Sequence, residues 1–203
     1  MAVHLHRNDI PQGLTFGAMA AVDTETMGLK PFRDRLCVVQ LSAGDGNAHL
    51  VQFPDGDYAA PRLKALLTDP GITKLFHFAR FDLAVLDRYL GVAAWPVYCT
   101  RTASRLVRTY TDRHGLKDLC KELLGIEISK TQQSSDWGAS DLTGPQRDYA
   151  AADVLYLHRL KERLDSMLAR EGRMELASAC FDFLPVRARL DLEGWAEEDI
   201  FAH

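Results

Sequence analysis

The stretch AMAAVDTETMGL, residues 18–29, decides the fold class. Its first five residues are small or apolar, so it predicts a strand over residues 18–23 with acidic residues at its end. Asp23 and Glu25 are two residues apart, and alternate side chains of a strand share one face, so both carboxylates point the same way. The spacing recurs at residues 191–193 without a preceding strand, so a turn or helix cap stays the alternative for Asp23.

Further strands and helices extend this start into an α/β pattern. Glycine-containing turns at residues 44–47 and 54–56 predict that the first three strands form an antiparallel meander. Thr143 and Gln146 form a capping-box pattern that predicts the start of a long helix. The expected strands are residues 18–23, 36–42, 49–53, 72–78 and 97–99, and the expected helices are residues 58–67, 81–90, 102–109, 116–124, 143–168 and 174–183.

Length and composition indicate a soluble globular protein. The 203 residues fit one domain of residues 1–170 with a helical extension over residues 171–203, and 47% of them are hydrophobic. No apolar run suits a membrane span, the N-terminus lacks a signal-peptide pattern, and the four cysteines show no metal or disulfide spacing, so we expect a cytoplasmic protein. A net charge of −4 argues against indiscriminate binding to duplex nucleic acid.

Two more acidic positions lie at junctions with helices. Asp82 follows the apolar run LFHFARF in the first turn of an expected helix, where stabilising the helix dipole is the alternative role. Tyr149 and Asp153 are four residues apart on the long helix, on the same face as the leucines that follow. An ionised carboxylate in such an apolar stripe is costly unless it is paired or coordinates a cation. A salt bridge to a buried arginine is the alternative to a metal ion.

Together these positions predict a catalytic metal site. Four carboxylates from separate segments, Asp23, Glu25, Asp82 and Asp153, match the oxygen ligands that Mg²⁺ and Mn²⁺ prefer. Two such ions about 3.5–4 Å apart activate a water molecule and stabilise the departing oxygen of a phosphodiester. The combination therefore indicates phosphodiester cleavage.

From residue 21 to about residue 164 the chain resembles the ribonuclease D-like branch of the DEDD 3′→5′ exonucleases, in the version with tyrosine in the third motif. The three motifs are similar to VDTETMGL at residues 22–29, HFARFD at residues 77–82 and YAAAD at residues 149–153. The chain differs at Phe78, where the family usually has asparagine, so an aromatic face replaces a hydrogen-bonding group. Since no accessory RNA-binding domain follows, it looks closest to the compact bacterial nanoRNase C type.

The resemblance implies an RNase H-like fold with a five-stranded mixed sheet, helices on both faces and a helical C-terminal extension. It also implies 3′→5′ hydrolysis of short single-stranded RNA, down to dinucleotides, by two Mg²⁺ or Mn²⁺ ions. The metal ligands would be Asp23, Glu25, Asp82 and Asp153, and Tyr149 would position the attacking water. The substrate-binding residues implied by the family are Thr24, Gly28, Leu29, His77, Phe78, Lys130 and Gln133.

Several alternatives stay open. Leu29, His77 and Phe78 also fit a purely structural role in the core. The basic stretch from Arg101 to Lys117 suits phosphates, a solvated helix surface or a contact between subunits. The resemblance implies a homo-oligomeric ring, an octamer. The rival functions are a DNA-directed exonuclease of proofreading type and a non-catalytic RNA-binding module on an exonuclease scaffold.

Overall fold

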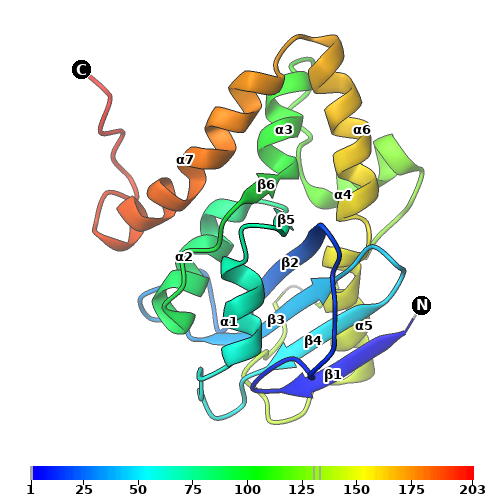
Figure 1. The fold of residues 1–203 in the computed structure, drawn as a ribbon, viewed down its shortest axis with the longest axis vertical. Helices are drawn as coiled ribbons and strands as arrows, with labels where there is room; N and C mark the ends of the chain where they lie inside the picture. Colours follow the sequence, from blue (N-terminus) through cyan, green and yellow to red (C-terminus); the bar gives the residue numbers. More distant parts are fainter. Residues whose placement is uncertain (1, 130, 133) are drawn as a thin grey trace.

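The computed structural model describes residues 2–129, 131–132 and 134–203, which fold around one mixed sheet (Figure 1). In this part of the chain the sheet has six strands in the order β1-β4-β3-β2-β5-β6. The strands β1 to β6 span Val3–Arg7, Met19–Thr26, Leu36–Ser42, Ala48–Gln52, Thr73–Phe76 and Val97–Cys99.

The predicted meander is confirmed, because β2, β3 and β4 pair antiparallel with one another in sequence order. Strands β5 and β6 continue the sheet in parallel on the other side of β2. The expected number of five strands is wrong by one, since β1 pairs in parallel with β4 at the edge. Its sequence VHLHR does not indicate a strand, because histidine and arginine occupy positions at which strands usually carry β-branched or aromatic residues.

Helices follow the strands as expected, with differences at their ends. The expected helix 58–67 begins only at Pro61, and the last helix continues past residue 183 to Leu192 with Pro185 inside it. The helices α1 to α7 span Pro61–Thr68, Ala79–Leu90, Thr100–Val107, Leu116–Leu119, Gly144–Leu155, Leu157–Arg170 and Met174–Leu192, and the π-helical turn η1 spans Cys120–Leu124. None of the helices in the described part of the chain is long and apolar enough to span a bilayer.

The long helix expected over residues 143–168 is two helices. Its predicted start is confirmed, because Thr143 and Gln146 exchange the hydrogen bonds of a capping box. Tyr156, with φ −110° and ψ −4°, departs from regular helical angles, so α5 ends there and α6 begins at the next residue, above α5 in Figure 1. This break lets α5 lie on the sheet while α6 packs against α3.

Helices cover both faces of the sheet. Neighbouring residues of β3 enter different apolar clusters, because successive side chains of a strand point to opposite faces. Val38 packs in a cluster with Ala150 of α5, whereas Val39 belongs to the larger core that includes Leu63 of α1 and Leu83 of α2. The central strand β2 is therefore covered on both sides, and its C-terminal end lies between α2 and α5.

Candidate active site

The two carboxylates of the first motif lie at the C-terminal end of β2. Asp23 and Glu25 sit on alternate residues of this central strand and so share the face toward α5. Asp153, on α5, completes a cluster in which one carboxylate oxygen from each residue lies within 4.8 Å of the others. Within the described residues this is the group of side chains arranged to hold a metal ion.

Asp82 enters the same cavity from the first turn of α2. Its carboxylate is buried, and the hydroxyl of Thr24 donates a hydrogen bond to its Oδ1 at 2.7 Å. Asp23 accepts a similar hydrogen bond, at 3.1 Å, from the buried side-chain amide of Gln40, the residue opposite it on β3. These donors hold each carboxylate in a defined orientation in the cavity.

Burial and crowding raise the pKa of these acids. Burial is the largest cause of the raised pKa of Asp23, and the charges of Asp82 and Asp153 add to it. The pKa of Glu25 rises to about 9 for the same reasons, and burial raises the pKa of Asp82 to about 7. Carboxylates packed this closely repel one another when ionised unless cations neutralise them.

The cluster therefore fits divalent cations. Four carboxylates in one cavity provide the oxygen donors that Mg²⁺ and Mn²⁺ prefer, and a bound cation favours the ionised forms that burial disfavours. The residues that would hold the ions are those of the cluster together with Asp82, namely Asp23, Glu25, Asp82 and Asp153.

Tyr149 lies one turn before Asp153 on α5 and lines the cavity. The centre of its ring lies 6.0 Å from the centre of the ring of the buried Trp137. Burial, followed by the charge of Asp153, raises the pKa of the Tyr149 hydroxyl above its ordinary value. The hydroxyl is therefore protonated at neutral pH. In this form it can orient a water molecule through a hydrogen bond, but it is a poor general base for removing a proton from that water.

The cavity around these residues measures about 560 Å³, a volume typical of small-ligand sites. Five of the seven expected substrate-binding residues line it: Thr24, Gly28, Leu29, His77 and Phe78. Leu29 is 84% exposed and Phe78 is 46% exposed, so neither is a core residue. The hydroxyl of Thr24 is engaged with Asp82. The remaining two expected residues, Lys130 and Gln133, lie outside the described residues.

Other residues of the wall were not assigned from the sequence. Ser134, Ser135 and Trp137 precede α5, and the side chain of Gln146 fixes this segment by donating to the carbonyl of Asp136 at 3.0 Å. The polar composition of the segment was the available signal, but it did not show which residues face the cavity.

The basic stretch divides into two groups. Arg101 and Lys117 line the cavity, and the guanidinium of Arg101 lies 4.8 Å from the centre of the Phe78 ring. Arg108 is instead fully buried and forms an ion pair with Glu122. The sequence spacing of the basic residues does not show which of them line the cavity and which are buried, because this depends on how the segment after α3 packs.

Comparison with known proteins agrees with this geometry. The pattern of a family described as 3′–5′ exonuclease matches residues 12–169. The chain belongs to the 3′–5′ exonuclease family. The matched part of this exonuclease contains every element that contributes an acid to the cavity. The RNase H-like α/β fold expected from the sequence is thereby confirmed.

Solved structures and curated relatives extend the likeness. Brucella melitensis NrnC bound to pGG is 58% identical, with a TM-score of 0.97 over 100% of this chain and 99% of that chain. The same protein with bound Mg²⁺ gives 57% identity and a TM-score of 0.96 over all of both chains. Ribonuclease D of Acidiphilium cryptum is 38% identical over 154 residues, which are 76% of this exonuclease but only 39% of that relative. The chain thus spans about two fifths of the ribonuclease D relatives that it matches.

Proposed function

We propose that this exonuclease is a metal-dependent 3′→5′ exoribonuclease that hydrolyses short oligoribonucleotides, down to dinucleotides, to 5′-mononucleotides. The observation that carries the proposal is the meeting of four carboxylates and one tyrosine in a single cavity of ligand size. The likeness to NrnC, which was solved with pGG and with Mg²⁺, supports it along the full chain.

The residues divide the reaction between them. Asp23, Glu25, Asp82 and Asp153 would hold two divalent ions, which would supply the charge that makes water a nucleophile and stabilises the departing 3′ oxygen. The hydroxyl of Tyr149 orients the attacking water, whose oxygen bonds to phosphorus as the bond from phosphorus to the 3′ oxygen breaks. The attacking water gives up one proton to solvent, and the leaving oxygen takes up one proton from solvent to become the new 3′ hydroxyl.

The cavity wall suits a short single strand. Leu29 and Phe78 expose apolar surface to the cavity, and unpaired bases stack on such groups. Arg101 and Lys117 supply positive charge for phosphates on the same wall. We assign nucleotide contacts to these residues and to Gly28 and His77. Lys130 and Gln133 remain candidates on the family pattern alone.

Two rival functions predict different products. A DNA-directed exonuclease shares the acids and would degrade the matching deoxyribonucleotides at least as fast as RNA. A non-catalytic RNA-binding module would retain RNA without shortening it, but all five reacting side chains are present and line one cavity. The geometry therefore favours an enzyme.

A time course on 5′-labelled RNAs of two to seven nucleotides, beside the matching DNAs, tests the proposal. We expect stepwise loss of mononucleotides from the 3′ end in Mg²⁺, with the dinucleotide cleaved at least as efficiently as longer RNAs, and no cleavage in EDTA. Preference for DNA, internal cuts or metal-independent turnover would contradict it.

We also propose that the exonuclease assembles into a homo-oligomeric ring, for which an octamer is the size the family resemblance suggests. The inner side of α7 is buried in its own chain, where Phe181 packs on Tyr98 with ring centres 4.5 Å apart. Its outer side carries exposed apolar residues at spacings of three and four, which is the pattern of a helix-helix seam. We call this seam the α7 stripe: Leu176, Ala179, Phe183 and Val186.

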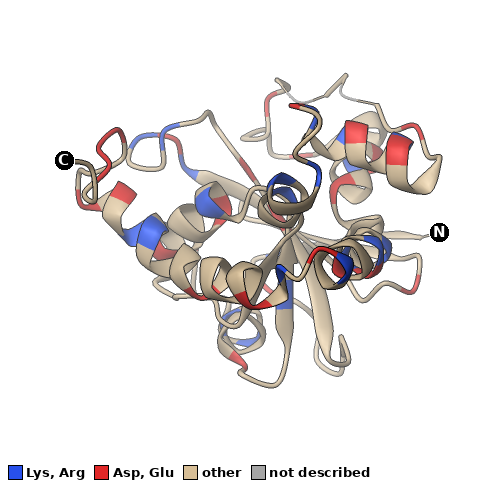
Figure 2. Ribbon diagram, turned by 90° about the horizontal axis from the view of Figure 1, so that it is seen from above, with Lys and Arg blue, Asp and Glu red and all other residues tan. Residues whose placement is uncertain are grey.

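Charged residues of both signs flank the stripe. Glu175 and Asp182 lie in the first half of α7, whereas Arg187 and Arg189 toward its end pair with Asp191 and Glu193 of the same chain, and Figure 2 shows acidic and basic segments along this helix. Because these arginines already have partners, the apolar stripe carries the proposal that a second copy of the chain packs here.

We further propose that the chain divides at residue 170 into an exonuclease domain and a helical extension, and that the protein is located in the cytoplasm.

Substituting the stripe tests the assembly. Phe183→Asp combined with Val186→Asp should convert the oligomer to a species near 22.7 kDa by light scattering, because charge in a packed seam is costly. Ser178→Asp, on the exposed polar side of the same helix, is the control and should leave the mass unchanged. Wild-type protein that is already monomeric at micromolar concentration would disprove the assembly.

A further inference from the structure

The helix that carries Asp82 begins in an unfavourable way. Phe78 occupies its N-cap position with φ 71° and ψ 45°, the left-handed region that residues with a Cβ rarely adopt. Its phenyl side chain makes no capping hydrogen bond, whereas the residues preferred at this position stabilise a helix through one. A conformation of this kind persists only where surrounding contacts hold it.

The C-terminal segment of the chain supplies such a contact. Arg80, in the first turn of α2, forms a two-point ion pair with Asp191 of α7, with Nε to Oδ2 at 2.5 Å and Nη2 to Oδ1 at 2.7 Å. The same Nη2 donates to the carbonyl of Ala196 at 2.7 Å. This planar fork fixes the direction of the arginine as well as its distance.

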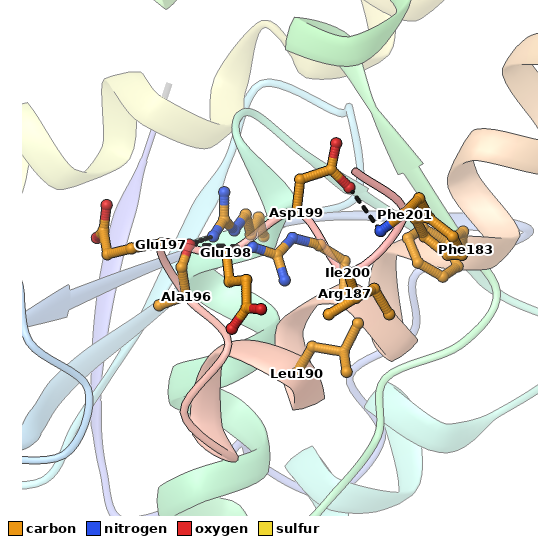
Figure 3. A pocket seen from close by; sticks show the side chains of 10 residues that line it. Phe183, Arg187, Leu190, Ala196, Glu197, Glu198, Asp199, Ile200 and Phe201 are labelled. Atoms are coloured by element: carbon orange, nitrogen blue, oxygen red, sulfur yellow. Dashed lines mark hydrogen bonds between the residues drawn. The ribbon is translucent and has the colours of Figure 1, made fainter. Parts of the chain in front are cut away.

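Asp191 and the turn after α7 are themselves held in place. Arg187 contacts Asp191 at 3.1 Å and donates to the carbonyls of Trp195 and Ala196 at 3.1 and 3.0 Å. Figure 3 shows Arg187 directed at this turn between α7 and the chain end. The partner that Arg80 meets is therefore a fixed element, and it lies 111 residues away in the sequence.

The opposite side of the same helical turn faces the cavity. Asp82 is two residues after Arg80, and helical residues at that spacing project from different sides. Its carboxylate receives the 2.7 Å hydrogen bond from Thr24 on β2. The first turn of α2 is thus clamped between the sheet on one side and the end of α7 on the other.

We propose that Arg80 and Asp191 are positioning residues, through which the C-terminal end of α7 holds Asp82 at the geometry that metal binding requires. The inference rests on the proposed role of Asp82 as a metal ligand. It gives the C-terminal extension a function inside its own subunit, separate from any role of the α7 stripe in assembly.

Asp191→Asn tests the proposal, because it keeps the size of the side chain and removes the charge that Arg80 grips. We expect Mn²⁺ affinity, measured by titration calorimetry without nucleotide, to fall by about 10-fold or more, as for other outer partners of metal ligands. The kcat for a dinucleotide should fall with it, whereas KM should change by less than about threefold. Arg80→Lys keeps the charge but loses the fork, so it should show the same pattern and serves where Asp191→Asn does not fold.

Two reference proteins make the outcome decisive. Arg189→Ala removes an exposed ion pair with Glu193 on the same helix and should leave Mn²⁺ affinity and kcat unchanged. A lower melting temperature with unchanged Mn²⁺ affinity and kcat in both test variants would overturn the proposal, because the link would then be structural only. Near-normal turnover of Asp82→Asn would instead show that the proposed metal site itself is wrong.

Discussion

Asp153→Asn is expected to abolish cleavage while the fold is retained. The carboxylate lies in the cluster with Asp23 and Glu25, and an amide cannot supply the charge that holds a cation there. We expect kcat in Mg²⁺ to fall by at least about 10³-fold, the size of effect that follows loss of a positioned electrostatic group. The melting temperature of the metal-free protein should not fall, since the substitution removes a charge that raises the pKa of both neighbours.

The control for this variant is on the same helix. Asp148→Asn changes an exposed acid one residue before Tyr149 and should leave turnover unchanged. Near-normal turnover of Asp153→Asn with Mg²⁺ would mean that the carboxylate cluster does not hold the catalytic ions. Loss of folding in place of activity would favour the alternative in which Asp153 is a structural ion-pair partner.

Tyr149→Phe is expected to lower kcat by about 10²–10⁴-fold with little change in KM. The substitution keeps the ring beside Trp137 and removes only the hydroxyl that borders the carboxylates. Single-turnover hydrolysis of a labelled dinucleotide measures the chemical step directly. The raised pKa of Tyr149 predicts that the wild-type rate shows no loss of activity from its deprotonation at ordinary assay pH.

Tyr156→Phe is the matched control, because Tyr156 lies at the junction of α5 and α6 and outside the cavity lining. It should retain wild-type kcat. A fully active Tyr149→Phe would reduce Tyr149 to a packing residue and require a different means of orienting water.

Local patterns predicted most of the fold. The β2-β3-β4 meander follows from apolar runs and glycine turns, and the start of α5 follows from its capping box. The end of α5 at Tyr156 could not be predicted from the sequence, because leucines continue the helical spacing on both sides of it. The extension of α7 past Pro185 depends on packing against α2, which local propensity does not register.

The acidic residues were predictable because each belongs to a short motif with its own local context. The wall formed by Arg101 and Lys117, and the link from Arg80 to Asp191, were not predictable. These contacts join segments whose approach is set by tertiary packing, so nothing in the local pattern marks one arginine as a cavity residue and another, Arg108, as buried.

The proposed reaction depends on four carboxylates that hold two divalent ions in one cavity. Titration of Mn²⁺ into the protein tests it most directly, with a dinucleotide whose bridging 3′ oxygen is replaced by a methylene group to prevent hydrolysis. Because the pKa of Glu25 is raised to about 9, binding should release protons and tighten as the pH rises from 6 to 8. We expect two ions per subunit in the wild-type protein and fewer in Asp153→Asn. No bound Mn²⁺, or the same number of ions in both proteins, would show that these carboxylates do not hold the catalytic ions.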